Sequence, residues 1–111
     1  MQNIKMLIYH IVLPKVWKKF KNEKFYSAES LQSEGFIHCS FAEQIETVLK
    51  RYYKDVENVL ILHIEPKFLT AKLVEEPSTN GAIYPHIYGK INLEAIVEIE
   101  EKQIGRGTNK L

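Results

Sequence analysis

The sequence predicts an α+β fold: a single compact domain with a split, mainly antiparallel β-sheet and two or three helices. The chain has 111 residues, a length that suits one domain. Hydrophobic residues make up 45% and charged residues 26% of it, a balance typical of globular domains that bury one core. Strand-like and helix-like segments follow one another without a regular β-α-β pattern, which favours antiparallel pairing over a doubly wound sheet.

The first elements are a strand and two short helices. Residues 6–12 (MLIYHIV) predict a strand that Pro14 ends, and proline also suits the first turn of a helix over residues 14–20. The stretch SAESLQSEG predicts a second helix, with Ser27 as its N-cap and Gly35 as its C-terminal stop.

A third and longer helix is expected after a short strand at residues 36–39 (FIHC). Ser40 is expected to cap this helix, because Glu43 follows three residues later as in a capping box. Apolar side chains at three- and four-residue spacing predict one buried stripe along the helix. The members of the stripe are Ala42, Ile45, Val48, Leu49 and Tyr52.

The second half of the chain reads mostly as strands. Residues 58–65 (NVLILHIE) are apolar at successive positions, which predicts a central strand buried on both faces. A strand at 72–76 and a turn-rich loop at 77–81 follow, and 86–91 predicts a short strand. Residues 95–102 alternate apolar and acidic side chains, which is typical of a half-exposed strand.

Composition narrows the class of protein. The formal net charge of +1 argues against a dedicated nucleic-acid binder, which is usually distinctly basic. Cys39 is the one cysteine, so an intramolecular disulfide and a cysteine-rich zinc site are excluded. No secretory signal is recognisable, and no apolar stretch approaches the roughly 20 residues that span a bilayer. We expect a cytoplasmic protein with no membrane partner, a domain at 6–102 and loose termini at 1–5 and 105–111; the oligomeric state stays open.

Three histidines stand out as candidate site residues. His10, His38 and His86 each lie on a strand-like segment among apolar or aromatic neighbours, next to a turn or a helix start. Ser40 shares a strand face with His38, and Tyr88 shares one with His86. A buried polar group needs a hydrogen-bond partner, so these residues either are satisfied within the core or line a cleft.

Other chemical interpretations of the sequence are weaker. Cys39 and His38 are adjacent on a strand and point to opposite faces, which argues against a thiol–histidine dyad and favours a buried cysteine. The histidines lack the spacing of a zinc motif, so no metal site is predicted. His63 is expected to be a surface histidine or an ion-pair partner. The lysine-rich run at residues 17–24 reads as a solvated helix face, with phosphate binding as the alternative.

Seven short motifs occur in a characteristic order along the chain. These are YHI, Trp17, YSAESLQSEGFIHCS, Gln44, LILHIE, Glu76-Pro77 and YPHIYGKI. In this order and spacing they resemble the domain of unknown function 952 family over about residues 6–102. The paired motifs SL-x-x-EGFIH-x-S and PHIYG carry most of the resemblance.

The resemblance implies a compact split-sheet fold similar to that of the ADP-ribosyltransferases and the tRNA 2′-phosphotransferases, which use NAD as a substrate. His10 would hydrogen-bond the ribose next to the nicotinamide, and Glu76 would stand where that superfamily often has a catalytic glutamate. The implied catalytic residues are His10, His38, Glu76 and His86, and the implied contacts to NAD are His10, Ser40 and Tyr88.

The residue types suit this chemistry. Breaking the nicotinamide–ribose bond develops an oxocarbenium-like ribose, which an oriented carboxylate and hydrogen bonds to the ribose hydroxyls can stabilise. Only Arg51 and Arg106 could serve as arginine ligands for an RNA phosphate, so a nucleic-acid substrate is not expected. Two functions stay open: an NAD- or nucleotide-using transferase, and a non-catalytic module that binds a nucleotide, an ADP-ribosyl group or a protein. No cofactor is predicted beyond NAD as a candidate substrate.

Overall fold

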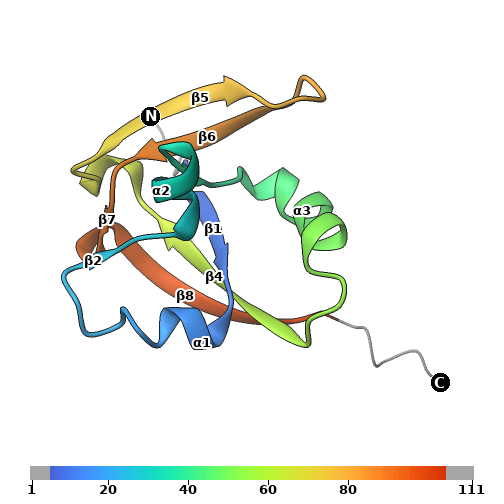
Figure 1. Ribbon diagram of the computed structural model, residues 1–111, viewed down its shortest axis with the longest axis horizontal. Coiled ribbons are helices and arrows are strands. Elements are labelled where there is room, and N and C mark those ends of the chain that lie inside the picture. Colours follow the sequence, from blue (N-terminus) through green and yellow to red (C-terminus); the bar gives the residue numbers. More distant parts are fainter. Residues whose placement is uncertain (1–5, 105–111) are drawn as a thin grey trace, which may run out of the picture.

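The computed structural model describes residues 6–104, and the predicted loose termini at 1–5 and 105–111 lie outside this range. Helices and strands follow one another as Figure 1 shows. In chain order they are β1 (Ile8–Val12), α1 (Pro14–Trp17), β2 (Phe25–Tyr26), α2 (Glu29–Glu34), β3 (Ile37–His38), α3 (Ile45–Tyr52), β4 (Asn58–Ile64), β5 (Lys72–Pro77), β6 (Ile83–Tyr88), β7 (Ile91–Asn92) and β8 (Ile96–Gln103). Short 3₁₀ helices cover Ala42–Gln44, Pro66–Phe68 and Leu93–Ala95.

The strands form antiparallel sheets, which confirms the predicted α+β class with a split sheet. One sheet has the order β1-β4-β8, a second has the order β3-β6-β5, and β2 pairs with β7. In Figure 1 the β5–β6 hairpin lies across one end of the molecule. Helix α2 contacts β3, which pairs with β6. No helix within the described residues is long and apolar enough to cross a membrane.

Strand β4 is central in its sheet, as its apolar run predicted. Val59 and Ile61 face one way, toward Leu49 of α3. Leu62 and Ile64 face the other way, into a larger cluster. Because both faces of β4 are buried, its residues are apolar at successive positions and do not alternate with polar ones.

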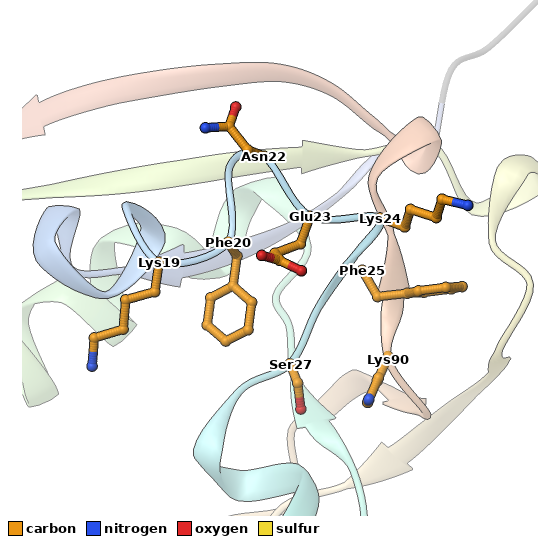
Figure 2. A pocket seen from close by; sticks show the side chains of 8 residues that line it. All are labelled: Lys19, Phe20, Asn22, Glu23, Lys24, Phe25, Ser27 and Lys90. Atoms are coloured by element: carbon orange, nitrogen blue, oxygen red, sulfur yellow. The ribbon is translucent and has the colours of Figure 1, made fainter.

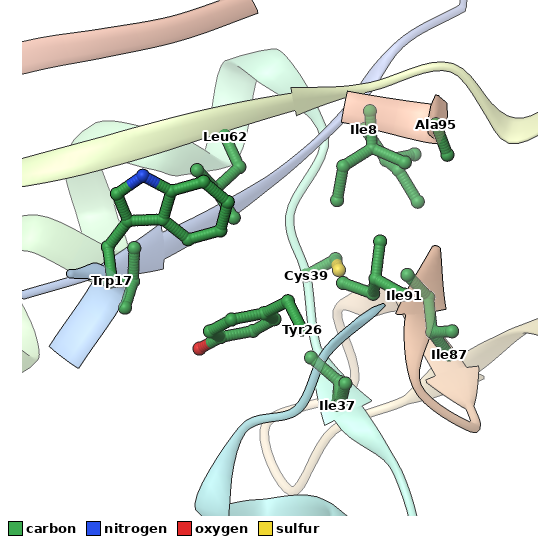
Figure 3. Packing of buried hydrophobic residues seen from close by; sticks show 11 residues of the cluster. Ile8, Trp17, Tyr26, Ile37, Cys39, Leu62, Ile87, Ile91 and Ala95 are labelled. Atoms are coloured by element: carbon green, nitrogen blue, oxygen red, sulfur yellow. The ribbon is translucent and has the colours of Figure 1, made fainter. Parts of the chain in front are cut away.

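The larger cluster joins the two three-stranded sheets. Figure 3 shows Leu62 of β4, Ile37 of β3 and Ile87 of β6 around the ring of Tyr26. Cys39 is buried in the same cluster, and burial raises the pKa of its thiol. The interpretation of Cys39 as a buried apolar residue is therefore confirmed, and a thiolate nucleophile is not available there.

The ends of the helices differ in part from the prediction. Gly35 ends α2 with φ of 93°, the left-handed conformation that glycine adopts without strain. The two predicted serine caps are wrong. Helix α2 begins after Ala28, without a side-chain cap. After Phe41 the chain turns into a 3₁₀ helix, and the Phe41 N–H donates to Oε1 of Gln44 at 2.9 Å.

Tertiary packing also changes the expected extent of two helices. Helix α1 ends at Trp17 and continues only as turns, so it is shorter than the predicted helix at residues 14–20. In the predicted buried stripe, Leu49 is buried, whereas Ala42 and Tyr52 are exposed. Tyr53, the next residue, packs on the core instead of Tyr52. Helix α3 ends at Tyr52, the last residue of the predicted stripe, but it begins only at Ile45, because Ala42–Gln44 form a 3₁₀ helix.

The segment predicted as one strand at 86–91 is two strands separated by Gly89. Strand β6 begins earlier, at Ile83, directly after residues 78–82, which form the turn of the β5–β6 hairpin. Gly89 has φ of 155°, and a Cβ atom there would lie 2.8 Å from Cβ of Ala71. The close approach explains why the chain has glycine at the corner between β6 and β7.

Candidate functional site

A hydrogen-bonded carboxylate lies on one face of the β5–β6 hairpin. Nδ1 of His86 donates to Oε1 of Glu76 at 2.6 Å, and the Tyr88 hydroxyl donates to the same carboxylate at 2.7 and 2.8 Å. His86 and Tyr88 come from alternate positions of β6, so they share a face of the sheet. Two donors on one carboxylate fix its orientation.

Aromatic rings extend this carboxylate site onto β3. His38 pairs directly with His86 across β3 and β6, and their ring centroids are 5.4 Å apart. Phe36 stacks on the His86 ring with a centroid distance of 4.1 Å and an interplanar angle of 17°. We call this surface the Glu76 face; its residues are Phe36, His38, Glu76, His86 and Tyr88.

The hydrogen bonds assign the protonation of the groups on the Glu76 face. The bond from His86, followed by that from Tyr88, lowers the pKa of the Glu76 carboxyl below its usual range, and Glu76 in turn raises the pKa of Tyr88. An ionised carboxylate only accepts, so Nδ1 of His86 carries a proton. In the neutral ring Nε2 then has a free lone pair, and no hydrogen bond within residues 6–104 occupies it.

This arrangement is suited to proton transfer. A histidine whose Nδ1–H is held by a carboxylate presents Nε2 as a general base, and the carboxylate stabilises the ring once it is protonated. His38 adds a second imidazole, which is exposed and hydrogen-bonded to Glu34, four residues earlier, at 3.1 Å. The Glu76 face therefore holds two imidazoles, one fixed by Glu76 and one on the open surface.

His10 lies beneath the Glu76 face instead of on it. Its Nδ1 donates to the backbone carbonyl of His38 at 2.7 Å, and its Nε2 accepts from the Tyr26 hydroxyl at 2.8 Å. Burial is the main cause that lowers the pKa of His10 to about 4. Both ring nitrogens are therefore occupied, and at neutral pH the ring is uncharged.

Ser40 is also buried, at the junction of the two large sheets. Its backbone exchanges hydrogen bonds with Tyr9 of β1, from Ser40 N to Tyr9 O at 2.7 Å and back at 2.9 Å. The structure therefore brings together four of the predicted site residues and places the other two in support. On the Glu76 face are His38, Glu76, His86 and Tyr88, and below it are His10 and Ser40.

Sequence reasoning missed two residues of the site region. Phe36 lies two residues before His38 in the predicted strand at 36–39, so the two share a face, and an aromatic ring beside a histidine was a usable signal. Glu34 lies four residues before His38, a spacing that on a helix would suggest an ion pair. Its contact forms here across the end of α2.

His63 has a separate, structural role, as predicted. Its Nε2 lies 2.9 Å from Oε1 of Glu100, and its Nδ1 lies 3.8 Å from Oε1 of Glu98. The contacts tie β4 to β8 on the surface. Among residues 6–104, no group of three or more histidine, cysteine or acidic side chains is placed to hold a metal ion.

Comparison with known proteins identifies the family. The model of the family described as "Protein of unknown function (DUF952)" matches residues 11–99. The chain belongs to the DUF952 family. No curated protein matches it.

Solved structures of a second protein share the fold. The crystal structure of protein CC0527 from Caulobacter crescentus matches with a TM-score of 0.75 and 26% sequence identity, over 87% of this chain and 84% of that one. The solution NMR structure of CC0527 gives a TM-score of 0.73 at 26% identity, over 85% and 82% of the two chains. These matches show the fold of the chain, and neither description states an activity. The likeness to ADP-ribosyltransferases stays a prediction.

Proposed function

We propose that this DUF952 protein binds NAD or a related nucleotide on the Glu76 face and transfers its ADP-ribosyl group. One observation supports this proposal most strongly. Glu76 is held by His86 and Tyr88 on an open surface that also presents aromatic rings. An oriented carboxylate beside a general base is the combination that breaking a ribosyl bond requires.

The proposed reaction breaks the bond between C1′ of the ribose and the nicotinamide nitrogen. Nicotinamide leaves with the bonding electron pair, and an acceptor hydroxyl or water attacks C1′ and gives its proton to Nε2 of His86. Glu76 stabilises the protonated ring through Nδ1–H, and its negative charge favours the oxocarbenium-like ribose. The Tyr88 ring, at 39% exposure, offers a face on which nicotinamide can stack.

The remaining predicted residues take supporting roles in the proposal. His38 would contact the ribose hydroxyls, since its ring is exposed next to His86. His10 is a positioning residue, because its bond to the His38 carbonyl fixes the backbone of β3. Ser40 positions the same segment by its bridge to Tyr9. The proposal places the reaction in the cytoplasm, where a single cysteine such as Cys39 stays reduced, and requires neither a metal ion nor a nucleic acid.

A second candidate is a non-catalytic module that binds an ADP-ribosyl group, a nucleotide or a protein. It is favoured by the open shape of the Glu76 face. Two surface hollows of the described residues, one near Lys19 and Lys90 and one near Glu46 and Lys102, are lined by other side chains, whereas most enzymes enclose their substrate in a cleft. A binding module needs the aromatic rings but not a charged Glu76.

Amide NMR titration and product analysis separate the two candidates. We expect NAD to give saturable shifts at residues 36–38 and 86–88, with nicotinamide released over hours and measured by chromatography. Glu76→Gln should abolish release but keep the shifts, whereas Glu75→Gln, an exposed neighbour in β5, should change neither. Binding without release in the native chain would favour the module. Absence of shifts at millimolar NAD and ADP-ribose would refute nucleotide binding on the Glu76 face.

A further inference from the structure

A hollow of about 490 Å³ lies on another part of the surface. Its lining comes from the segment that follows α1, from β2 and from the corner between β6 and β7. None of the five residues of the Glu76 face lines it. Figure 2 shows Lys19 at one end and Ser27 with Lys90 at the other; the ring of Phe20 lies between these ends, and the ring of Phe25 extends past Lys90.

Positive charge exceeds negative charge in the lining of the hollow. Among residues 6–104, the lysine that forms an ion pair is Lys102, with Glu46. Lys19 and Lys90, which approach the hollow from distant parts of the chain, have no such partner within this range. Glu23 also lines the hollow, and no ion pair with a described residue engages it. Two lysines against one glutamate leave a local excess of positive charge.

Lys24 contributes less to the hollow than these two lysines. In Figure 2 its side chain extends outward from the rim. The pKa of the nearby Glu94 carboxyl is lowered mainly by the hydrogen bond from Asn92, and the charge of Lys24 adds a smaller effect. Lys19 and Lys90 are therefore the cations that a ligand in the hollow would meet.

A hydroxyl group faces the same hollow. Ser27 was expected to cap α2, but the helix begins after Ala28 without a side-chain cap. No hydrogen bond within residues 6–104 engages the Ser27 hydroxyl. A serine hydroxyl and a lysine ammonium at one end of a hollow are donors that suit phosphate oxygens.

Aromatic rings give the hollow an apolar side. Phe25 is 44% exposed, although its neighbour Tyr26 is fully packed in the core. Phe20 packs against Tyr26 edge-on, with ring centroids 5.1 Å apart, which leaves the Phe20 ring as a fixed wall. An exposed phenylalanine ring beside cations is suited to a planar ligand that bears negative charge.

We propose that this hollow binds a phosphate monoester carried by a planar ring system, of which a nucleoside monophosphate is the simplest example. The phosphate lies at the end of the hollow with Lys90 and accepts from Ser27, and the ring of the ligand packs against Phe20. Lys19 adds positive charge at the far end. The volume falls in the range of small-molecule sites. Binding in the hollow does not depend on the transferase reaction proposed for the Glu76 face.

The test uses the full ¹⁵N-labelled chain and three probes: AMP, adenosine and inorganic phosphate. We expect AMP to give saturable amide shifts at residues 19–27 and 89–91. Adenosine and phosphate should each bind at least about tenfold more weakly, because each lacks half of the recognised chemistry. AMP binding should weaken as salt rises, since the lysines are partly exposed and screened.

Matched variants make the test sharp. Replacing Lys19 and Lys90 together by alanine should weaken AMP binding about tenfold. About fivefold comes from the exposed ion pair with Lys90, and about twofold comes from the more distant charge of Lys19. The control removes Lys50 and Lys67, which are equally exposed but outside this hollow, and should leave the affinity unchanged. Glu23→Gln should tighten binding, because it removes the opposing charge.

Three outcomes would overturn the proposal. The first is equal AMP affinity in the two double variants. The second is AMP shifts confined to other residues, including those of the Glu76 face. The third is phosphate binding as tightly as AMP, which would leave only a general anion site. Loss of NAD turnover in Glu76→Gln bears on the transferase alone, so failure of one proposal can be told from failure of the other.

Discussion

Acid should destabilise this protein through one buried histidine. Folding buries His10 in its neutral form, which lowers its pKa from 6.5 to about 4. The unfolded chain therefore binds a proton more readily, and the stability from this group is full above pH 6.5 and is lost as pH falls toward 4. At pH 5 the His10 ring is protonated in roughly a tenth of native molecules but in nearly all unfolded molecules. Between pH 7 and pH 5 the free energy of unfolding should therefore fall by about 2 kcal/mol.

The assay is urea unfolding, monitored by the fluorescence of Trp17, at pH values from 7 down to 5. This window lies above 4.5, the ordinary pKa of a glutamate carboxyl. The variant His10→Gln keeps a donor and an acceptor but cannot titrate. Its free energy of unfolding should therefore not show the decrease of about 2 kcal/mol between pH 7 and pH 5, whatever its value at pH 7. The control His38→Gln keeps His10 and should keep the loss. An equal pH dependence in His10→Gln and the native chain would refute the reasoning.

Three further predictions concern single contacts. Tyr26→Phe deprives the buried Nε2 of His10 of its donor and should lower the free energy of unfolding by about 2 kcal/mol, measured by urea unfolding at pH 7. Gly89→Ala should cost about 2 kcal/mol as well, because the new Cβ would lie 2.8 Å from Ala71 Cβ; an unchanged melting temperature would show that this corner can relax. Glu76 has a lowered pKa, so its stability contribution exists above its ordinary pKa and is lost in acid. On acidification below about pH 4.5, the free energy of unfolding should therefore decrease less in Glu76→Gln than in the native chain. Identical acid unfolding curves of the two proteins would contradict this.

The sequence was informative where local physics decides the outcome. The unbroken apolar run around Leu62 predicted a central strand because few other elements bury both faces. Gly35 predicted the end of α2 because it adopts a conformation that other residues avoid. The alternation of side chains in strands placed His86 and Tyr88 on one face, which is where the structure has them.

Long-range pairing is what the sequence left undetermined. Nothing local indicates that β3 pairs with β6, so the contact between His38 and His86 could not be derived from either strand alone. The same holds for His10, whose burial depends on a tyrosine sixteen residues later. Ser40 has the local pattern of a cap, but its backbone is taken by a bridge to β1, and Gln44 caps the following turn instead.

Strand β8 has a consequence for how copies of the protein meet. It pairs with β4 alone among the described strands, and it carries the exposed apolar residues Val97 and Ile99. The free edge of such a strand is a template for joining a second chain. If two copies paired antiparallel about Ile99, Glu98 of each would face Glu100 of the other, and like charges directly opposite are destabilising. The acidic residues of β8 thus act as gatekeepers, and they keep an apolar edge from joining itself at neutral pH.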